Sequence, residues 1–496
     1  MASSNGAARP RIAIAGAGMS GIGFGGMLRA AGHENFTIYE KAGEVGGTWR
    51  ENRYPGLSCD VPARYYSYSW APNPDWTHAF SPGPEIHDYF IGCSHRFGLR
   101  DRIRFGTEIT EARWEDGRWL LSTAAGATAE ADVFITATGF LHHPRIPEIE
   151  GIDEFEGRIF HSARWDDGAL VDGVRVGVVG NGSTGVQIVT ALAGRARSLT
   201  MFQRSAQWMF PMPNHEYSGL SRRLFGRSPR LNRLSYRLNQ RFLEATFGRA
   251  TVEPGLQRRW ISAVCRANLR RIKDPELRRK LTPDHEPMCR RLIMSSGFYP
   301  AIQRPGVELV TDPIERIEAE GVRTADGRLH QLDVIVLATG FDFHAHMRPM
   351  SMVGEGGLTL DEAWAAGPRA YRTIAMPGFP NYFMLLGPHS PVGNHSLVAV
   401  LETQGAYILD WIGRLRRGEI TRTAPTVEAT DRFNQDMRDA MPDTIWTSGC
   451  TSWYLGPDGR PELWPWTPER FRQMLEKPDE TEYEVARQAP PRGQTP

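Results

Sequence analysis

Two glycine-rich turns of the form GxGxxG constrain the fold of this chain more than any other feature. The first, at residues 16–21, follows the apolar run 11–15, and the second, at residues 180–185, follows the apolar run 174–179. Strand, turn and helix in this order form a dinucleotide-binding unit whose helix N-terminus faces a pyrophosphate. The chain is therefore predicted to be an α/β protein with two Rossmann-like units. Their candidate cofactor contacts are Gly16, Gly18, Gly21, Gly180, Asn181, Gly182, Ser183, Thr184 and Gly185.

The residues that end the second strand of each unit differ in charge. In the first unit, strand 36–39 ends at Glu40, whose carboxylate can accept hydrogen bonds from the ribose hydroxyls of an adenosine. In the second unit, strand 198–203 ends in Arg204 and Ser205. A carboxylate at this point would repel a 2′-phosphate, whereas a guanidinium and a hydroxyl suit it. The second unit is therefore predicted to favour NADPH over NADH.

The phrase ATGF occurs twice, each time at the end of an apolar strand, in residues 132–140 and 333–341. This turn is typical of flavoproteins with two dinucleotide-binding domains, where it marks the points at which the chain leaves and re-enters the first domain. The segment between the two turns is therefore predicted to be an inserted domain. The length of 496 residues agrees, because single cores stop growing beyond about 250–300 residues.

The stretch between the two units, residues 155–166 (FEGRIFHSARWD), combines a turn glycine, an imidazole, a large ring and a carboxylate. Its pattern, FxGxxxHxxxW followed by Asp, resembles the fingerprint of the type I (class B) Baeyer–Villiger monooxygenases. Residues 46–60 match a second pattern of that family, GGxWxxxxYPGxxxD. The alternative for the first stretch is an interdomain linker with a packed Trp and a hydrogen-bonded His. The fingerprint residues are Phe155, Gly157, His161, Trp165 and Asp166.

The resemblance implies a monooxygenase that uses FAD, NADPH and O2 to convert ketones into esters or lactones through a C4a-peroxyflavin, with sulfoxidation as an open side activity. It also implies a row of residues along the flavin. For Trp49 and Tyr66 ordinary core packing is an equal alternative, and Ile109 can equally be an ordinary strand residue. The residues that the resemblance places against FAD are Gly47, Thr48, Trp49, Asp60, Tyr66 and Ile109.

The resemblance also assigns the catalytic residues. The family carries a basic residue and then its active-site arginine where this chain has Arg290 and Arg291. Arg291 is the predicted catalytic cation, and Asp60 is the carboxylate expected to pair with it. The alternative is a pair of surface arginines. Further on, Trp453 resembles the aromatic residue of a mobile loop that covers NADP in the family.

These motifs predict a division of the chain into domains. Residues 1–150 are expected to form the first part of the FAD-binding domain. Residues 151–335 would form the inserted NADPH-binding domain, with a basic amphipathic helical excursion at about 215–285. This excursion is expected to cap the substrate cavity, with membrane contact as the less favoured alternative. Residues 336–480 would complete the FAD-binding domain and carry the NADP-covering loop, and residues 481–496 are expected to be a flexible tail.

Composition restricts the other function classes. The formal net charge of +1 provides no global field for nucleic acid or an anionic membrane, so nucleic-acid binding and membrane association are not expected. The five cysteines include no CxxC pair, which argues for a reducing compartment and against a redox-active disulfide. No metal site is predicted, and without a signal core or an apolar run of about 18 residues the chain is expected to be cytoplasmic. Its oligomeric state stays open.

Three rival functions remain. A flavin-containing N- or S-monooxygenase shares the fold but needs no catalytic arginine, and its linker usually has Tyr or Phe where Trp165 and Asp166 stand. A pyridine-nucleotide disulfide reductase is disfavoured because the chain lacks a cysteine pair. A non-catalytic nucleotide-binding protein would bind the same cofactors without turnover. The sequence does not identify the ketone.

Overall fold

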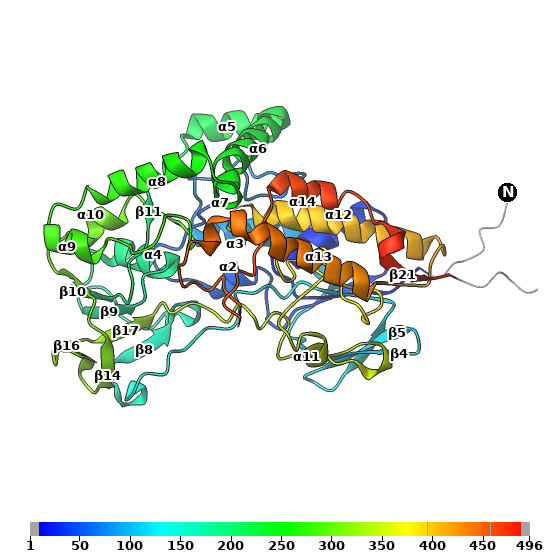
Figure 1. Ribbon diagram of the computed structural model, residues 1–496, viewed down its shortest axis with the longest axis horizontal. Coiled ribbons are helices and arrows are strands. Elements are labelled where there is room, and N and C mark those ends of the chain that lie inside the picture. Colours follow the sequence, from blue (N-terminus) through cyan, green and yellow to red (C-terminus); the bar gives the residue numbers. More distant parts are fainter. Residues whose placement is uncertain (1–8, 394, 457, 488–496) are drawn as a thin grey trace, which may run out of the picture.

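The computed structural model describes residues 9–393, 395–456 and 458–487, which fold around two parallel β-sheets lying side by side along the molecule (Figure 1). The strand order is β19-β7-β1-β2-β3 in the first sheet and β13-β10-β9-β17-β8 in the second. The first sheet contains β1 (Ile12–Ala15), β2 (Phe36–Tyr39), β3 (Ile103–Arg104), β7 (Val133–Thr136) and β19 (Tyr382–Met384). The second contains β8 (Arg158–His161), β9 (Arg175–Val179), β10 (Ser198–Phe202), β13 (Val307–Val310) and β17 (Val334–Leu337).

Both faces of the first sheet are covered, which explains why every residue of β1 and β7 is buried. On one face Ile12 and Ile14 pack into a core shared with the helices α1 (Met19–Ala30), α3 (Gly83–Arg96) and α12 (Leu397–Arg416). On the other face Phe134 packs against Trp119 of a mixed sheet, in which β4, β5 and β6 are antiparallel and β18 pairs with β4 in parallel. That sheet contains β4 (Ile109–Glu115), β5 (Arg118–Thr123), β6 (Thr128–Ala131) and β18 (Ser351–Val353).

The second sheet is built in the same way. Val176 and Val178 pack on one face with α4 (Ser183–Leu192) and α10 (Phe298–Ile302). On the other face Ile335 packs with Ile317 of a small antiparallel sheet. That sheet contains β14 (Ile314–Glu318), β15 (Gly321–Thr324) and β16 (Leu329–Gln331).

The chain passes between the sheets at the two ATGF turns. It leaves the first sheet after β7, enters the second at β8, and returns from β17 to β19. Strands β8 and β17 pair in parallel, with His161 opposite Leu337. The outgoing and returning segments therefore lie next to each other. The predicted α/β fold with two Rossmann-like units is confirmed.

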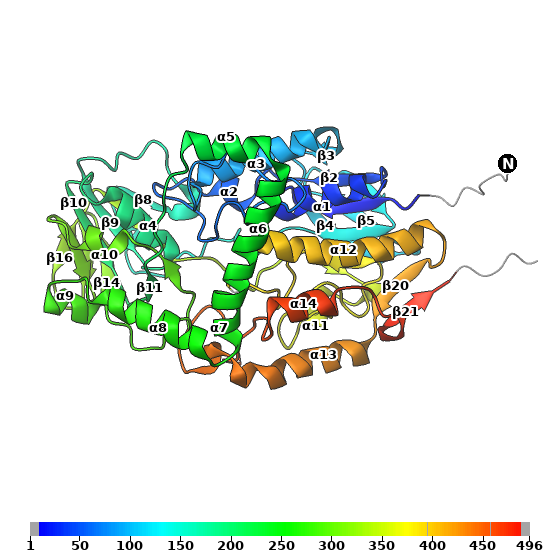
Figure 2. The ribbon, with the colours of Figure 1, turned by 90° about the horizontal axis from the view of Figure 1, so that it is seen from above.

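A helical arm projects from the second unit and lies across the upper side of the molecule in Figure 1, where α6 crosses over the other helices as seen in Figure 2. A single π-helical turn, Glu244–Gly248, follows α6 directly. The strands β11 (Met209–Phe210) and β12 (Ile293–Met294) pair beside the two ends of the arm. The helices of the arm are α5 (Gly219–Arg227), α6 (Pro229–Leu243), α7 (Arg249–Val252), α8 (Leu256–Leu269) and α9 (Pro275–Lys280).

The C-terminal part packs against the first unit. It includes α13 (Val427–Ala440), α14 (Pro468–Met474) and the antiparallel pair β20 (Arg422–Pro425) and β21 (Tyr483–Ala486). The flexible tail expected from residue 481 therefore starts too early. Tyr483 is buried, and its hydroxyl lies 3.0 Å from that of Tyr407. The rest of that segment, residues 488–496, lies outside the described residues. Within the described residues, no helix is both long and apolar enough to cross a membrane.

Candidate active site

A large cleft runs between the two units and contains nearly all of the predicted cofactor contacts. The cleft has a volume of about 1460 Å³, and residues of both glycine turns line it. Gly21 and Gly185 are absent from its lining. A Cβ at either position would lie 1.9 or 2.1 Å from the carbonyl oxygen of the first glycine in its own turn. These two glycines therefore allow α1 and α4 to pack closely against the glycine turns that precede them. The other glycines of the turns line the cleft.

The helices that follow the two turns begin without a side-chain cap. The N-caps of α1 and α4 are Gly18 and Gly182, and neither helix has an acidic residue in its first turn. By contrast, the N-caps of α5, α6, α9, α13 and α14 are Ser, Thr or Asp side chains that accept backbone N–H groups. Uncapped N–H groups at the positive end of a helix form an anion site. Each turn therefore fits a pyrophosphate.

In the first unit the predicted acidic residue, Glu40, is hydrogen-bonded to the glycine turn. The Glu40 carboxylate is buried and accepts hydrogen bonds from the N–H groups of Ala17 at 2.8 Å and Ala42 at 2.9 Å. Further along the cleft, Trp49 donates its indole N–H to the Tyr66 hydroxyl at 3.1 Å. Burial raises the pKa of Tyr66, so its hydroxyl stays protonated at neutral pH. Both rings line the cleft, as does Ile109.

In the second unit two guanidinium groups line the same part of the cleft. Asn181 donates its amide to Gln203 at 2.9 Å and to the carbonyl of Ser205 at 2.7 Å, which fixes the turn against the end of β10. Arg290 donates to the Ser205 hydroxyl at 2.6 Å, and its buried Nε has no hydrogen-bond partner among the described residues. The pKa of Arg290 is lowered, mainly by burial. The charge of Asp284 raises this pKa in part, and the charge of the neighbouring Arg204 lowers it further. A dianionic phosphate would relieve this repulsion.

The predicted catalytic pair joins the two units. Arg291, from the second unit, donates from Nη2 at 2.6 Å and from Nε at 3.2 Å to the same carboxylate oxygen of Asp60, from the first unit. The charge of Asp60 raises the pKa of Arg291, so the guanidinium is permanently charged. Both side chains are partly buried, which protects the pair from solvent screening.

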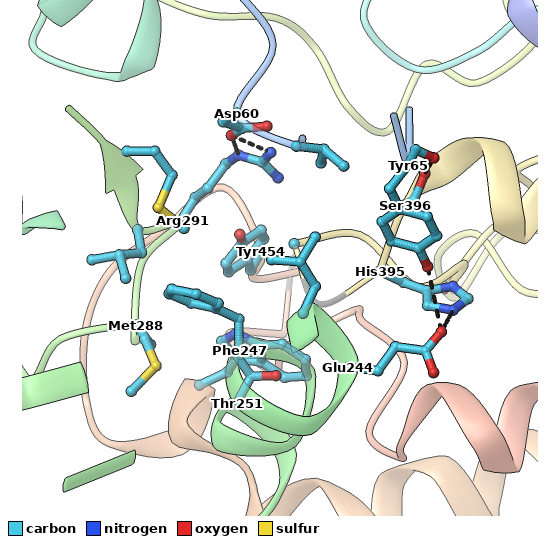
Figure 3. Close-up of a pocket in the computed structure, with 16 residues that line it drawn as sticks. Asp60, Tyr65, Glu244, Phe247, Thr251, Met288, Arg291, His395, Ser396 and Tyr454 are labelled. Carbon is cyan, nitrogen blue, oxygen red and sulfur yellow. Dashed lines mark hydrogen bonds and ion pairs between the residues drawn. The ribbon is translucent and has the colours of Figure 1, made fainter. Parts of the chain in front are cut away.

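Tyr454 lies beside this pair and carries no sequence prediction of its own (Figure 3). A Cβ built on Gly393 would lie 3.0 Å from the Tyr454 hydroxyl and 3.7 Å from Nη1 of Arg291. The two polar groups therefore converge on the space that this glycine leaves open. Burial raises the pKa of Tyr454 to about 12, so the hydroxyl is neutral and can donate a hydrogen bond at neutral pH.

A second, smaller cavity of about 70 Å³ adjoins Arg291. Figure 3 shows the Asp60–Arg291 pair on one side of it and a polar group formed by Tyr65, Glu244 and His395 on the other. Between them the wall is mainly apolar. The apolar side chains of this wall are Val61, Leu243, Phe247, Met288, Leu292, Met294 and Trp446. Leu243 and Phe247 come from the helical arm, so the arm closes this cavity, as expected for the excursion.

Glu244 joins the arm to the first unit. Its carboxylate accepts two hydrogen bonds from Arg472, at 2.7 and 2.9 Å, and one from His395 at 3.2 Å. Burial works against the charge, but the hydrogen bonds from His395 and Arg472 hold the pKa of Glu244 at about 2. Burial lowers the pKa of His395, so the neutral ring donates its Nε2–H to Glu244. No local motif marks these residues, and the sequence prediction misses all of them.

The fingerprint residues lie outside both cavities. A Cβ on Gly157 would lie 2.5 Å from the carbonyl oxygen of Asp333, so only glycine allows β8 to start beside β17. His161 ends β8 and accepts the N–H of Ala163 at 3.1 Å, and its ring packs edge-on against Phe341 of the second ATGF turn. Phe155 and Trp165 are buried, and Asp166 accepts a hydrogen bond from Arg158. These contacts connect the two units at the junction.

A disulfide lies near the site, and the spacing of the cysteines in the sequence does not predict it. Cys289 forms a disulfide with Cys450, although 161 residues separate them. This disulfide does not fit the reducing compartment that the cysteine spacing favours, because thiols there stay reduced. The bond ties the segment that carries Arg290 and Arg291 to the loop that carries Trp453, whose ring stacks on Phe343 at 3.9 Å and lines the large cleft.

Comparison with known proteins agrees with this site. A family model described as flavin-binding monooxygenase-like matches residues 9–353. An uncharacterized monooxygenase of Mycobacterium tuberculosis is 54% identical over 97% of each chain. A Baeyer–Villiger monooxygenase of Streptomyces coelicolor is 38% identical over 97% of this chain and 93% of its own length. The crystal structure of OTEMO in complex with FAD and NADP matches with a TM-score of 0.86 and 27% identity, over 96% of this chain and 99% of that one.

These matches cover the whole described architecture and confirm the predicted enzyme class, an FAD- and NADPH-dependent monooxygenase. The chain belongs to the flavin-binding monooxygenase family, and within it to the Baeyer–Villiger monooxygenases.

Proposed function

We propose that this chain inserts one oxygen atom of O2 beside the carbonyl of a small, mainly apolar ketone, giving an ester or a lactone. FAD would bind in the first unit, built around the sheet β19-β7-β1-β2-β3, and NADPH in the second, built around the sheet β13-β10-β9-β17-β8. The observation that carries the proposal is the Asp60–Arg291 pair, which borders both the cofactor cleft and the small cavity.

The chemistry of the oxygen belongs to the cofactors: bound FAD, once reduced by NADPH, supplies the activated oxygen. The residues of the chain stabilise charge. Negative charge develops on the carbonyl oxygen of the ketone as it is attacked, and Arg291 provides a fixed cation beside the cavity. Asp60 holds the planar guanidinium in one orientation, which costs no reorganisation during the reaction. The protonated hydroxyl of Tyr454 is a second donor at the same place.

The lining of the small cavity supports the choice of substrate. Its wall between Arg291 and Glu244 is mainly apolar, and the polar atoms of Glu244 are already bonded to Arg472, Gln240 and His395. A ketone with a hydrocarbon body would therefore bury apolar surface there and direct its carbonyl toward Arg291.

The coenzyme site follows the same reasoning. Arg204, Ser205 and Arg290 surround the end of β10, where a dinucleotide carries its adenosine ribose. Two guanidinium groups and a hydroxyl would bind a 2′-phosphate by charge-assisted hydrogen bonds. NADPH would therefore be preferred over NADH.

The rival within the family is an N- or S-monooxygenase, which has no use for a fixed cation at the substrate. The decisive experiment incubates the FAD-loaded enzyme with NADPH and a panel of cyclic, linear and aryl ketones plus a thioether, and identifies products by gas chromatography. We expect ester or lactone from at least one ketone class. Sulfoxide as the sole product, with every ketone unchanged, would favour the rival.

A further inference from the structure

The outer face of α6 carries a stripe of large apolar side chains that leave about half of their surface exposed in the described structure. The stripe consists of Leu231, Leu234, Leu238 and Phe242, which are between 40% and 56% exposed. Their spacing of three or four residues places them above one another on a single face of the helix. Isolated exposed leucines are common on protein surfaces, but four in one row on one helix are not.

A parallel stripe of arginines lies next to the apolar one. Arg230, Arg233, Arg237 and Arg241 are exposed and repeat with the same spacing, each one position before an apolar residue of the first stripe. The third face of α6 packs inward through Asn232 and Tyr236, and Tyr236 meets Tyr65 edge-on at 5.2 Å. The helix therefore has one face for the protein body and two for the surroundings.

The preceding helix extends the same surface. In α5, Leu220 and Leu224 are exposed one turn apart, and Arg223 and Arg227 follow with the same spacing. Figures 1 and 2 show α5 and α6 as neighbours on the outer side of the molecule. We name the apolar and arginine stripes of α5 and α6 together the arm surface.

The charge of this region departs from that of the whole chain. Between residues 218 and 260 there are two glutamates and no aspartate or lysine, against a set of ten arginines. Glu244 is bonded inside to Arg472, and Glu253 pairs with Arg249 at 3.0 Å. The ten arginines are Arg222, Arg223, Arg227, Arg230, Arg233, Arg237, Arg241, Arg249, Arg258 and Arg259. The near-neutral total therefore conceals a strongly basic surface. That total argues only against a global field, and for this run the sequence leaves membrane contact as the less favoured alternative to a cap over the substrate cavity.

We propose that the arm surface docks on an anionic lipid membrane, with the leucine stripe in the boundary of the acyl chains and the arginines on the phosphates. A helix with leucine and phenylalanine on one side and arginine on the next is the type that lies in a membrane interface. A second copy of this chain suits the surface less well. A twofold contact would place the arginine stripe against its own copy, which carries the same charge.

The other side of the arm faces the substrate cavity. Leu243 ends α6, and Phe247 follows in the π-helical turn, and both line the cavity beside Arg291. A docked arm would thus have lipid on one face and the cavity on the other. A lipophilic ketone dissolved in the membrane is the substrate class that suits this arrangement, an extension that rests on the proposed function. The docking itself is independent of that function, because vesicle binding requires no turnover.

The test measures co-sedimentation of the FAD-loaded full-length protein with phosphatidylcholine vesicles that contain or lack phosphatidylglycerol. We expect binding only to the anionic vesicles, weakened by salt. Arg233→Gln/Arg237→Gln/Arg241→Gln should weaken binding at least ~10-fold, because each basic residue near an anionic surface contributes several-fold. Leu231→Ser/Leu234→Ser/Leu238→Ser should weaken it by about the same factor, since the buried apolar area is lost.

The matched control is Leu170→Ser, since Leu170 is 77% exposed but lies outside the arm, and it should bind as the wild type does. FAD absorbance and thermal unfolding check that the variants are folded, and their outward-facing positions make this the expected result. Absence of binding to anionic vesicles by the wild type would overturn the proposal. Equal binding by the wild type and both triple variants would also overturn it. A wild-type dimer in sedimentation velocity that the leucine variant dissociates, without vesicle binding, would instead assign the surface to a second copy.

Discussion

The two dinucleotide-binding units share a turn and differ in the side chains around it. The first glycine of each turn has a positive φ, +104° for Gly16 and +107° for Gly180, and each would place a Cβ within 2.7 Å of a carbonyl oxygen in its own ATGF turn. At the end of the following strand, however, Glu40 is buried and bonds back to its turn, whereas Arg204 is exposed to the cleft. The backbone of the turn therefore determines where a dinucleotide binds, and a few side chains determine which dinucleotide is preferred.

The two units also divide the proposed catalytic pair between them, since Asp60 belongs to the first and Arg291 to the second. A cation assembled in this way depends on the relative position of the units. Several contacts fix that position. They include the fingerprint junction at β8 and β17, the bonds of Glu244 to His395 and Arg472, the Cys289–Cys450 disulfide and the Asp60–Arg291 pair itself. Substitutions at these contacts should distinguish cofactor binding, which each unit provides by itself, from oxygenation of the substrate, which needs both units in the correct relative position.

The largest effect is expected for Arg291→Ala. Hydride transfer to flavin uses both cofactors but no cation at the substrate, whereas ester formation places negative charge beside Arg291. Loss of one preorganised oxyanion partner costs about 3–4 kcal/mol, so ester formation should fall about 10²–10³-fold. Anaerobic flavin bleaching by NADPH, followed in a stopped-flow instrument, should stay near normal, and NADPH consumption should shift to hydrogen peroxide.

Arg291→Lys is the control for charge without the planar fork, and it should restore only a small part of the activity. An alanine variant that makes ester at the native rate would show that Arg291 is a structural arginine. A variant that loses ketone oxidation but keeps sulfoxidation would show that the sulfur reaction uses the flavin without this residue.

The next effect concerns the contact between the arm and the first unit. The pKa of Glu244 is about 2 in the folded protein against 4.5 for an ordinary glutamate, so this carboxylate stabilises the fold above pH 4.5 and loses that contribution as pH falls toward 2. The full contribution is on the order of 3 kcal/mol. Compared with Glu244→Gln, the wild type should lose more stability between neutral and acidic pH.

Denaturant unfolding at a series of pH values measures this difference. The matched control is Glu318→Gln, whose carboxylate has a similarly lowered pKa but is bonded to Arg323 within one small sheet and so connects no two parts of the molecule. A pH profile of Glu244→Gln parallel to that of the wild type would mean that Glu244 does not hold the arm.

The third effect concerns coenzyme choice. The ratio of kcat/KM for NADPH to that for NADH should be about 10–1000 in the wild type, as expected for a charge-assisted phosphate contact. Arg290→Ala should lower it about 10-fold or more, since it removes a guanidinium that lines the cleft beside Ser205. Glu40→Gln, in the other unit, should weaken FAD binding and leave the ratio unchanged. Equal use of both coenzymes by the wild type would contradict the assignment of the second unit.

The sequence predicts the parts of this molecule whose physical requirements are local. A glycine turn, the acid or arginine that ends the next strand, and an apolar strand all lie within about forty residues, so Gly16, Glu40, Gly180 and Arg204 are where the motifs predict. Arg291 and Asp60 come from the family resemblance, and 231 residues separate them.

Contacts without a local pattern are missed. Glu244 meets His395 and Arg472 across 151 and 228 residues, and Cys289 meets Cys450 across 161. Each of these residue types is ordinary at its position, and only tertiary packing brings the partners together. The arm surface is only partly predicted. The basic amphipathic run is visible in the sequence, with membrane contact as the less favoured alternative to a cap over the substrate cavity, but the exposure of its leucine and arginine stripes is decided by what packs on α6.

The smallest expected effect concerns the loop that carries Trp453. Its ring stacks on Phe343, lines the cleft, and is held near Arg291 through the disulfide of Cys450. If the ring covers the coenzyme, Trp453→Ala should leave FAD binding intact, weaken retention of NADP a few-fold, and raise the hydrogen peroxide released per NADPH consumed.

Trp466→Ala is the matched control, because Trp466 packs with Trp464 and Phe433 away from the cleft. The ratio of ester to peroxide, measured for both variants, decides between the two roles of Trp453. If the ratio changes only in Trp453→Ala, the Trp453 ring contacts the coenzyme. If the ratio equals that of the wild type and only thermal stability falls, Trp453 is a packing residue that holds the loop to Phe343.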